Sequence, residues 1–204
     1  NTPDGTLMEL KKLIAERQIE RLWVVGSNDT TADLIDASYK RFIKLMDNHI
    51  SVSKFLFGDK LSSADFAIYG QLTQLVGFDP TSRKIACETS LRLVAWVDIM
   101  ADLSGHDVEN SNWIPLEDSP DSLKEIMIEF GKMYVPALLA NARAITEGEE
   151  TWETEIDGST WKQKTFPYQA KCLKWIKEEF DKLDDDDKSR VRVFLDGTGC
   201  EVIL

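Results

Sequence analysis

Cysteine and histidine are scarce in this sequence, and their positions exclude several kinds of site. The three cysteines, Cys87, Cys172 and Cys200, stand far apart and form no CxxC motif. Such isolated cysteines predict neither a disulfide framework nor a zinc site. We therefore expect reduced thiols, a cytoplasmic location and no bound metal. The two histidines, His49 and His106, lie in unrelated segments, so nothing local indicates a catalytic Cys–His pair.

Cations are also in the minority. Lys and Arg total 24 against 36 Asp and Glu, which gives a formal net charge of −12 at pH 7. Affinity for phosphates and for anionic lipid headgroups comes mainly from Lys and Arg, so this balance argues against binding to nucleic acid or to a membrane surface. The longest uncharged run after Asp65 extends from Phe66 to Phe78 and is too short to span a bilayer.

The sequence lacks the motifs of several common enzyme classes. It contains no GxGxxG, GxxxxGK[ST], HExxH or GxSxG motif and no calcium-binding EF-hand loop. These absences argue against the usual nucleotide-binding, zinc-hydrolase and serine-hydrolase classes. No basic, apolar leader opens the chain. Because it begins with Asn1 rather than Met, we expect a fragment, a processed product or a trimmed chain.

Apolar residues, in contrast, are plentiful and follow a helical spacing. The 204 residues are 43% hydrophobic, and a chain of this size buries roughly 70% of its extended surface. In most segments the apolar residues recur every three or four positions, which predicts an all-α fold. Helices are predicted at 7–22, 29–51, 61–74, 85–103, 122–146, 167–183 and 184–195. Pro136 should kink the fifth of these helices or make it restart.

The segment around residue 62 carries the clearest local signal. Ser62 is placed to cap a helix, and Asp65 follows three positions later, which predicts a capping box with Asp in place of the usual Glu. Leu61 before the cap and Phe66 in the first turns predict a hydrophobic staple. The residues that follow leave almost no polar face, so we expect a buried central helix.

One segment, at about 151–164, departs from helical spacing. Trp152, Thr154 and Ile156 alternate with acidic residues, and Asp157-Gly158 is a type I′ turn signal. This pattern predicts a small β-hairpin that pairs Glu153 with Lys162 and Thr154 with Trp161. Its apolar face, which holds Trp152, Ile156 and Trp161, must pack against the helices.

Two groups of side chains have both a structural and a functional interpretation. The acidic run at 184–187 is more typical of a solvated helix N-terminus than of a cation site. A set of aromatic residues either packs in the core, which is commoner, or lines the pocket of a helical small-molecule-binding protein. This set comprises Trp113, Tyr134, Trp152, Trp161 and Trp175.

The stretch FLFGDKLSSADFAIYGQLTQ at 55–74 resembles the C-terminal helical domain of the glutathione S-transferase superfamily. In that family the residues matching Leu61, Ser62, Asp65 and Phe66 form the capping box and staple of a buried helix. The resemblance extends from about residue 34 to 105. Segments at 133–142, 167–175 and 197–200 resemble the extended C-terminal end of a bacterial group within the superfamily. We therefore expect a glutathione S-transferase C-terminal-like core at 1–105 and a helical extension with the hairpin at 106–204.

The resemblance also implies what this chain does. Glutathione S-transferases have an N-terminal thioredoxin-like domain that binds glutathione and activates its thiol, and this sequence has no such segment. We therefore expect no catalytic residue and no cofactor site in this chain; glutathione is expected only with the missing domain. The chain would contribute the hydrophobic wall for the second substrate, an electrophile, and would be inert by itself. The residues expected in that wall are Tyr39, Tyr69, Trp113 and Tyr134.

A second class of function is consistent with the same residues. Helical domains of this superfamily also serve as non-catalytic modules in protein assemblies, and an acidic surface suits basic partners. The expected partners are the missing thioredoxin-like domain and, in a homodimer, a second copy of the chain. A thioredoxin-like domain with a catalytic-type residue would favour the enzyme, whereas its absence, or one without glutathione contacts, would favour the module.

Overall fold

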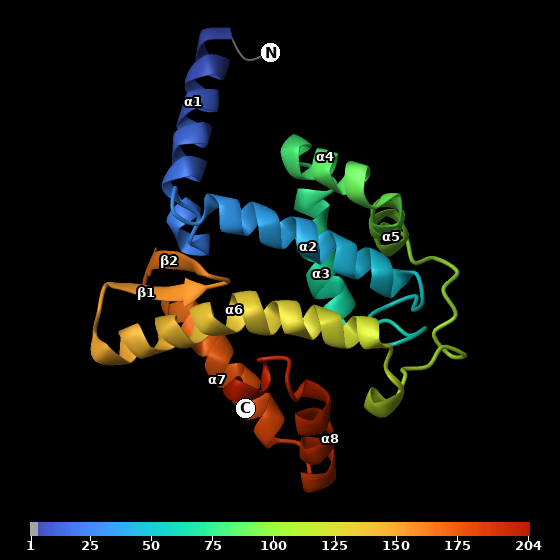
Figure 1. Ribbon diagram of the computed structural model, residues 1–204. Coiled ribbons are helices and arrows are strands. Elements are labelled where there is room, and N and C mark those ends of the chain that lie inside the picture. The colour runs from blue at the N-terminus through green and yellow to red at the C-terminus, as the bar shows by residue number, and fades with distance from the viewer. Residues whose placement is uncertain (1–3) are drawn as a thin grey trace.

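The computed structural model describes residues 4–204, which form an all-α fold with one small β-hairpin (Figure 1). Its helices are α1 (Asp4–Glu20), α2 (Ala32–Ile50), α3 (Ser63–Leu75), α4 (Pro80–Thr89), α5 (Leu91–Ala101), α6 (Asp121–Glu147), α7 (Pro167–Asp181) and α8 (Asp185–Leu195). The strands are β1 (Thr151–Ile156) and β2 (Ser159–Lys164), and short 3₁₀ helices occupy Leu22–Val25, Leu116–Asp118 and Glu201–Ile203. The expected boundary between residues 105 and 106 falls in the loop that follows α5.

The longest helix, α6, lies beside α2 and takes part in all three hydrophobic clusters of the core (Figure 1). In the largest cluster, Leu123 and Ile126 of α6 pack with residues from α2, α3, α4 and α5. In the second, the hairpin packs on Ala140 and Ala144. In the third, α7 and the C-terminal residues pack on the middle of α6. Sequence segments that are far apart are therefore held together by one helix.

The predicted hairpin is confirmed, register included. Asp157 and Gly158 have φ angles of 52° and 73°, as a type I′ turn requires. Glu153 pairs with Lys162 and Thr154 with Trp161. The apolar face formed by Trp152, Ile156 and Trp161 is buried against α6 and the start of α2.

The expectation that 61–74 forms a buried central helix is wrong. On α3 only Asp65 and Leu72 are buried, and Phe66 is 49% exposed. The helix packs through one narrow face, and the rest of its apolar surface stays open. Leu61 packs against the largest cluster, while its staple contact with Phe66 remains a prediction.

Two predicted helix boundaries differ from the structure. The segment 85–103 forms two helices, because Ser90 leaves the helical conformation and its hydroxyl accepts from the amide of Leu93 to cap α5. The helix does not restart at Pro136, since α6 runs continuously from Asp121 to Glu147, while a kink at this position remains a prediction. Proline costs the helix one backbone hydrogen bond, and burial of the flanking Val135 and Leu138 in the third cluster opposes that cost.

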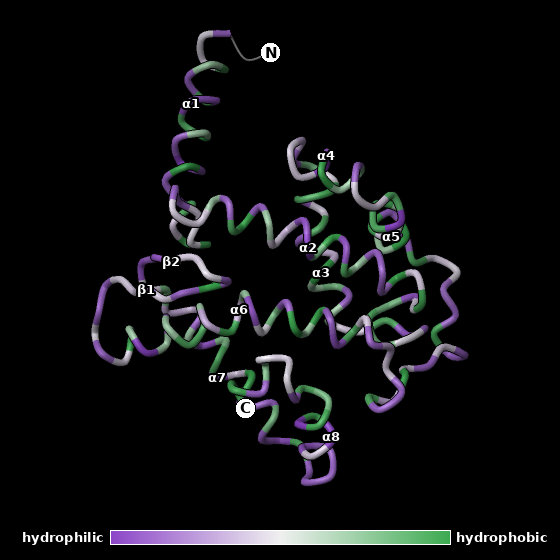
Figure 2. Tube along the Cα trace, viewed as in Figure 1, coloured by the Kyte–Doolittle hydropathy of each residue, from purple (hydrophilic) through white to green (hydrophobic). Residues whose placement is uncertain are grey.

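The first helix stands apart from the rest of the molecule. α1 extends away from the other helices, and none of its residues is buried (Figure 1). Hydrophobic positions nevertheless recur along it (Figure 2). Its exposed apolar side chains are Leu7, Met8, Leu10, Leu13, Ile14 and Ile19.

Candidate functional site

An apolar groove of about 640 Å³ lies between α3 and α6, with α2 contributing to its wall. This volume is within the range of small-molecule pockets in proteins. Gln71 contributes the one polar side chain among the residues that form it. The residues of this apolar groove are Phe42, Leu56, Phe57, Ala64, Ala67, Ile68, Gln71, Leu72, Leu75, Leu123, Ile126, Met127 and Phe130.

The capping box at the start of α3 determines where one wall of the groove lies. The Asp65 carboxylate accepts from the amide of Ser62 at 2.8 Å and from its hydroxyl at 2.6 Å, and the Ser62 hydroxyl accepts from the amide of Asp65 at 3.4 Å. The other carboxylate oxygen of Asp65 accepts from the amide of Leu56 at 2.8 Å. The same side chain therefore caps α3 and ties the segment carrying Leu56 and Phe57 to it.

A second hollow, of about 510 Å³, adjoins the apolar groove. We call it the Tyr39 hollow, and its residues are Ser27, Ala32, Ile35, Asp36, Ser38, Tyr39, Phe42, Leu75, Thr81, Ser82, Ile85, Glu129, Phe130 and Met133. Phe42, Leu75 and Phe130 line both spaces. Phe42 and Phe130 stack with ring centroids 6.3 Å apart, and they join α2 to α6 at this point. The two spaces are therefore neighbours along the same pair of helices.

Tyr39 remains protonated in this hollow. Its hydroxyl lies 3.2 Å from the carbonyl oxygen of Ser82 and 3.4 Å from that of Leu75, and it donates to these acceptors. Burial, with smaller contributions from Asp79 and Cys87, raises the pKa of Tyr39 to about 12. The hydroxyl is a hydrogen-bonding group at neutral pH rather than an activated nucleophile.

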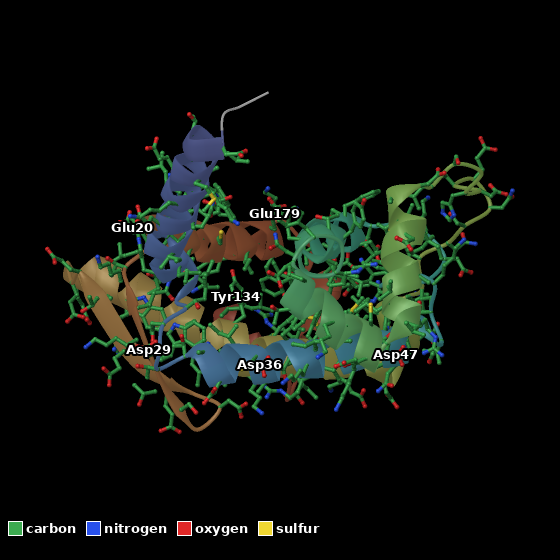
Figure 3. The ribbon with its side chains drawn as sticks, turned by 90° about the horizontal axis from the view of Figure 1, so that it is seen from above. Glu20, Asp29, Asp36, Asp47, Tyr134 and Glu179 are labelled. Carbon is green, nitrogen blue, oxygen red and sulfur yellow. The ribbon has the colours of Figure 1, made fainter. Side chains whose placement is uncertain are left out.

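The other three aromatic residues expected in the substrate wall lie elsewhere. Tyr69 is on α3 and packs against the largest core cluster. Trp113 is in the loop before α6, where its indole donates to the carbonyl of Leu61 and Lys60 lies over its ring. Tyr134 is on α6 (Figure 3) and is 42% exposed; partial burial, with a smaller contribution from Cys172, raises its pKa. Of the four, only Tyr39 is among the residues that line the groove or the hollow.

Ion pairs border the Tyr39 hollow on the side of the hairpin. Glu129 of α6 lines the hollow and pairs with Arg41 of α2 at 2.8 Å. Arg41 also lies 3.0 Å from Asp157, which pairs with Lys132 at 2.6 Å. Lys132, with a smaller effect from Arg41, lowers the pKa of Asp157. These side chains tie α2, α6 and the hairpin turn together.

The described residues contain neither a metal-binding cluster nor a membrane-spanning helix. Within 4–204 no three or more His, Cys, Asp or Glu side chains are grouped so that they could hold a metal ion. Every helix in the same range is too short or too polar to cross a bilayer. The groove presents apolar side chains and Gln71, and the hollow adds hydroxyls and the carboxylates of Asp36 and Glu129.

Comparisons with known proteins leave the family assignment open. No protein-family model matches the sequence, no curated protein matches it significantly, and no solved structure matches the fold significantly. The functional argument therefore depends on the geometry of this chain.

Sequence reasoning missed the apolar groove because its residues come from four separate segments. A partial signal was present in α3, where Ala67, Ile68, Leu72 and Leu75 leave little polar surface. From this pattern we expected the other helices of the chain to cover the whole apolar surface of α3. In the structure, part of the same apolar face borders open space.

Proposed function

We propose that the apolar groove binds a hydrophobic small molecule. We further propose that the chain is the C-terminal helical part of a glutathione S-transferase-like protein. The observation that supports binding is a groove of about 640 Å³ in which Gln71 is the one polar side chain. Burying apolar ligand surface there contributes about 25 cal/mol for each Å² removed from water.

In the parent protein this groove would form part of the wall for the second substrate. The proposal replaces the predicted wall of Tyr39, Tyr69, Trp113 and Tyr134 with the groove residues and keeps Tyr39 at its border. The sheet within residues 4–204 is the two-stranded hairpin, and these residues hold no thioredoxin-like domain. Glutathione would bind only to the missing N-terminal domain, and the chain by itself would be inert.

A titration with Nile red, an uncharged apolar dye, tests binding in the groove. We expect saturable fluorescence enhancement with the natural chain. Ala67 lines the groove but is solvent-exposed, so Ala67→Trp should fill the site without disturbing the core. This variant should bind the dye about tenfold more weakly or worse, which corresponds to about 1.4 kcal/mol.

Ala95→Trp is the matched control, because Ala95 is exposed on α5 and lies outside the groove. It should bind the dye like the natural chain. Equal dye binding by both variants would place the dye elsewhere and contradict the proposal, as would a natural chain that gives no enhancement.

A second candidate function is a protein-interaction module, and α1 is the observation that favours it. A helix of this length with no buried residue and with exposed leucines is typical of a segment that pairs with another protein surface. A homodimer formed through α1 is the simplest form of this proposal, and the oligomeric state of the full chain tests it.

A further inference from the structure

The apolar groove and the Tyr39 hollow differ sharply in the side chains that they present. Gln71 is the one polar side chain in the groove, whereas the hollow presents hydroxyls and two carboxylates. Both spaces lie along α6, where Leu123 lines the far end of the groove and Met133 lines the hollow. Ten residues of helix separate these two positions, a distance of about 15 Å. A ligand that spans both spaces would therefore be elongated, apolar along most of its length and polar at one end.

The charges in the hollow indicate the sign of that polar end. Asp36 and Glu129 line the hollow, and no Lys or Arg is among its lining residues. Glu129 is held by Arg41, whereas the Asp36 side chain is half-exposed and pairs with the half-exposed Lys40 at 2.5 Å. Asp36 lies in the N-terminal half of α2, where Figure 3 labels it. A cationic head could replace Lys40 beside Asp36, whereas a carboxylate head would find no Lys or Arg among the residues that line the hollow.

The Tyr39 hydroxyl adds a further acceptor for such a head. Because it donates its proton to the backbone carbonyls at Leu75 and Ser82, its oxygen lone pairs remain to accept a hydrogen bond. An ammonium group has three donors and no acceptor. It therefore matches a carboxylate, a tyrosine oxygen and the hydroxyls of Ser38 and Thr81, which also line the hollow.

We propose that the groove and the hollow together bind a single-chain amphiphile with a primary ammonium head. The alkyl chain occupies the apolar groove, crosses beside Phe42 and Phe130, and places its head near Asp36 and Tyr39. This inference rests on the proposed function, since it requires the groove to bind apolar ligands, and it adds the chemical class of the ligand.

Competition among three probes of equal chain length tests the inference. Dodecylammonium, dodecanol and dodecanoate are titrated against bound Nile red, below their micelle concentrations and in about 0.15 M salt, which screens the net charge of the protein. We expect dodecylammonium to displace the dye at the lowest concentration and dodecanoate at the highest, about tenfold or more apart. Ala67→Trp, which weakens binding of the dye itself, should leave little bound dye for any of the three probes to displace.

A pair of variants separates a specific head site from general attraction to an acidic protein. Asp36→Asn should bring the three probes to nearly equal concentrations. Asp33→Asn, the matched control at an exposed acid of α2 outside the hollow, should leave the order unchanged. An ammonium preference that survives Asp36→Asn would overturn the inference, and so would equal displacement by all three probes in the natural chain. In both cases dye binding would still support the proposed function, whereas a groove that binds no dye would overturn both proposals.

Discussion

Substitution of Asp65 should lower the free energy of unfolding more than the loss of an ordinary helix cap does. A lost cap costs about 1 kcal/mol, but Asp65 is fully buried and also accepts from the amide of Leu56. Removing the carboxylate would leave that amide buried without a partner, which costs a further 1–3 kcal/mol or so. We expect Asp65→Ala to lower the free energy of unfolding by about 2 kcal/mol or more in urea denaturation.

The cap of α4 provides the control for this prediction. Asp79 is itself the N-cap of α4 and accepts from the amide of Ser82 at 2.8 Å, but it is not buried. Asp79→Ala should therefore lower the urea midpoint by clearly less than Asp65→Ala. Equal losses from the two variants would show that the bond to Leu56 adds nothing to the cap.

His49 makes the stability of the fold depend on pH. It is fully buried, its Nδ1 lies 2.9 Å from the hydroxyl of Ser122, and its Nε2 lies 3.1 Å from the carbonyl oxygen of Leu56. A carbonyl only accepts, so Nε2 carries the proton and Nδ1 accepts from Ser122. Burial lowers the pKa of His49 below its ordinary value of 6.5, against opposing contributions from Phe55, Leu56 and Asp65.

Because the folded-state pKa of His49 is lowered, the unfolded chain takes up the proton first as pH falls. The stability associated with neutral His49 is therefore present above pH 6.5 and is lost progressively below it, toward the folded-state pKa. We expect the free energy of unfolding to fall between about pH 7 and about pH 5. In His49→Gln, which is less stable at neutral pH, this part of the slope should be absent; an unchanged slope would assign it to other groups.

At the scale of whole elements, α1 and α3 show apolar surface that the chain itself does not cover. Most of the stability of a helix in a protein comes from tertiary packing, and α1 buries none of its residues, so its exposed leucines indicate a partner. We expect the natural chain to sediment as a dimer and Leu10→Glu/Ile14→Glu to sediment as a monomer. The helix content should fall by no more than the share of α1, because neither residue is buried in the rest of the fold.

The control for α1 introduces the same charges at polar positions of the same helix. Thr6→Glu/Gln18→Glu should remain dimeric by sedimentation velocity. A natural chain that is monomeric over the whole concentration range would rule out the homodimer, and an equal loss of dimer in both variants would assign it to charge rather than to apolar contact.

Local signals predicted some elements fully and others only in part. The hairpin was predicted to the residue because its turn type, alternation and register are all encoded within fourteen neighbouring residues. The capping box was predicted for the same reason. The break at Ser90 was missed, although serine is a common cap, because the apolar spacing continues through it.

At the scale of the molecule, α6 organises the fold and the candidate site. It provides one side of each hydrophobic cluster and one side of both the groove and the hollow. Glu129 and Phe130, which are adjacent in the chain, illustrate the two roles of α6. Glu129 pairs with α2, while Phe130 stacks on Phe42 between the two spaces. We therefore expect a change in the α6 residues of the groove to affect the packing of the whole chain as well.

The sequence by itself determined the helical class, the hairpin with its register and the cap of α3. Each depends on residues within a few positions of one another, where backbone geometry and hydrogen bonding are local. Only the tertiary structure decided which apolar faces are covered, since periodicity marks a face as apolar without naming its neighbour. The open face of α3, the gathering of groove residues from distant segments and the separation of Tyr39 from Trp113 and Tyr134 follow from long-range packing around α6, and that packing is set by contacts between residues far apart in the chain.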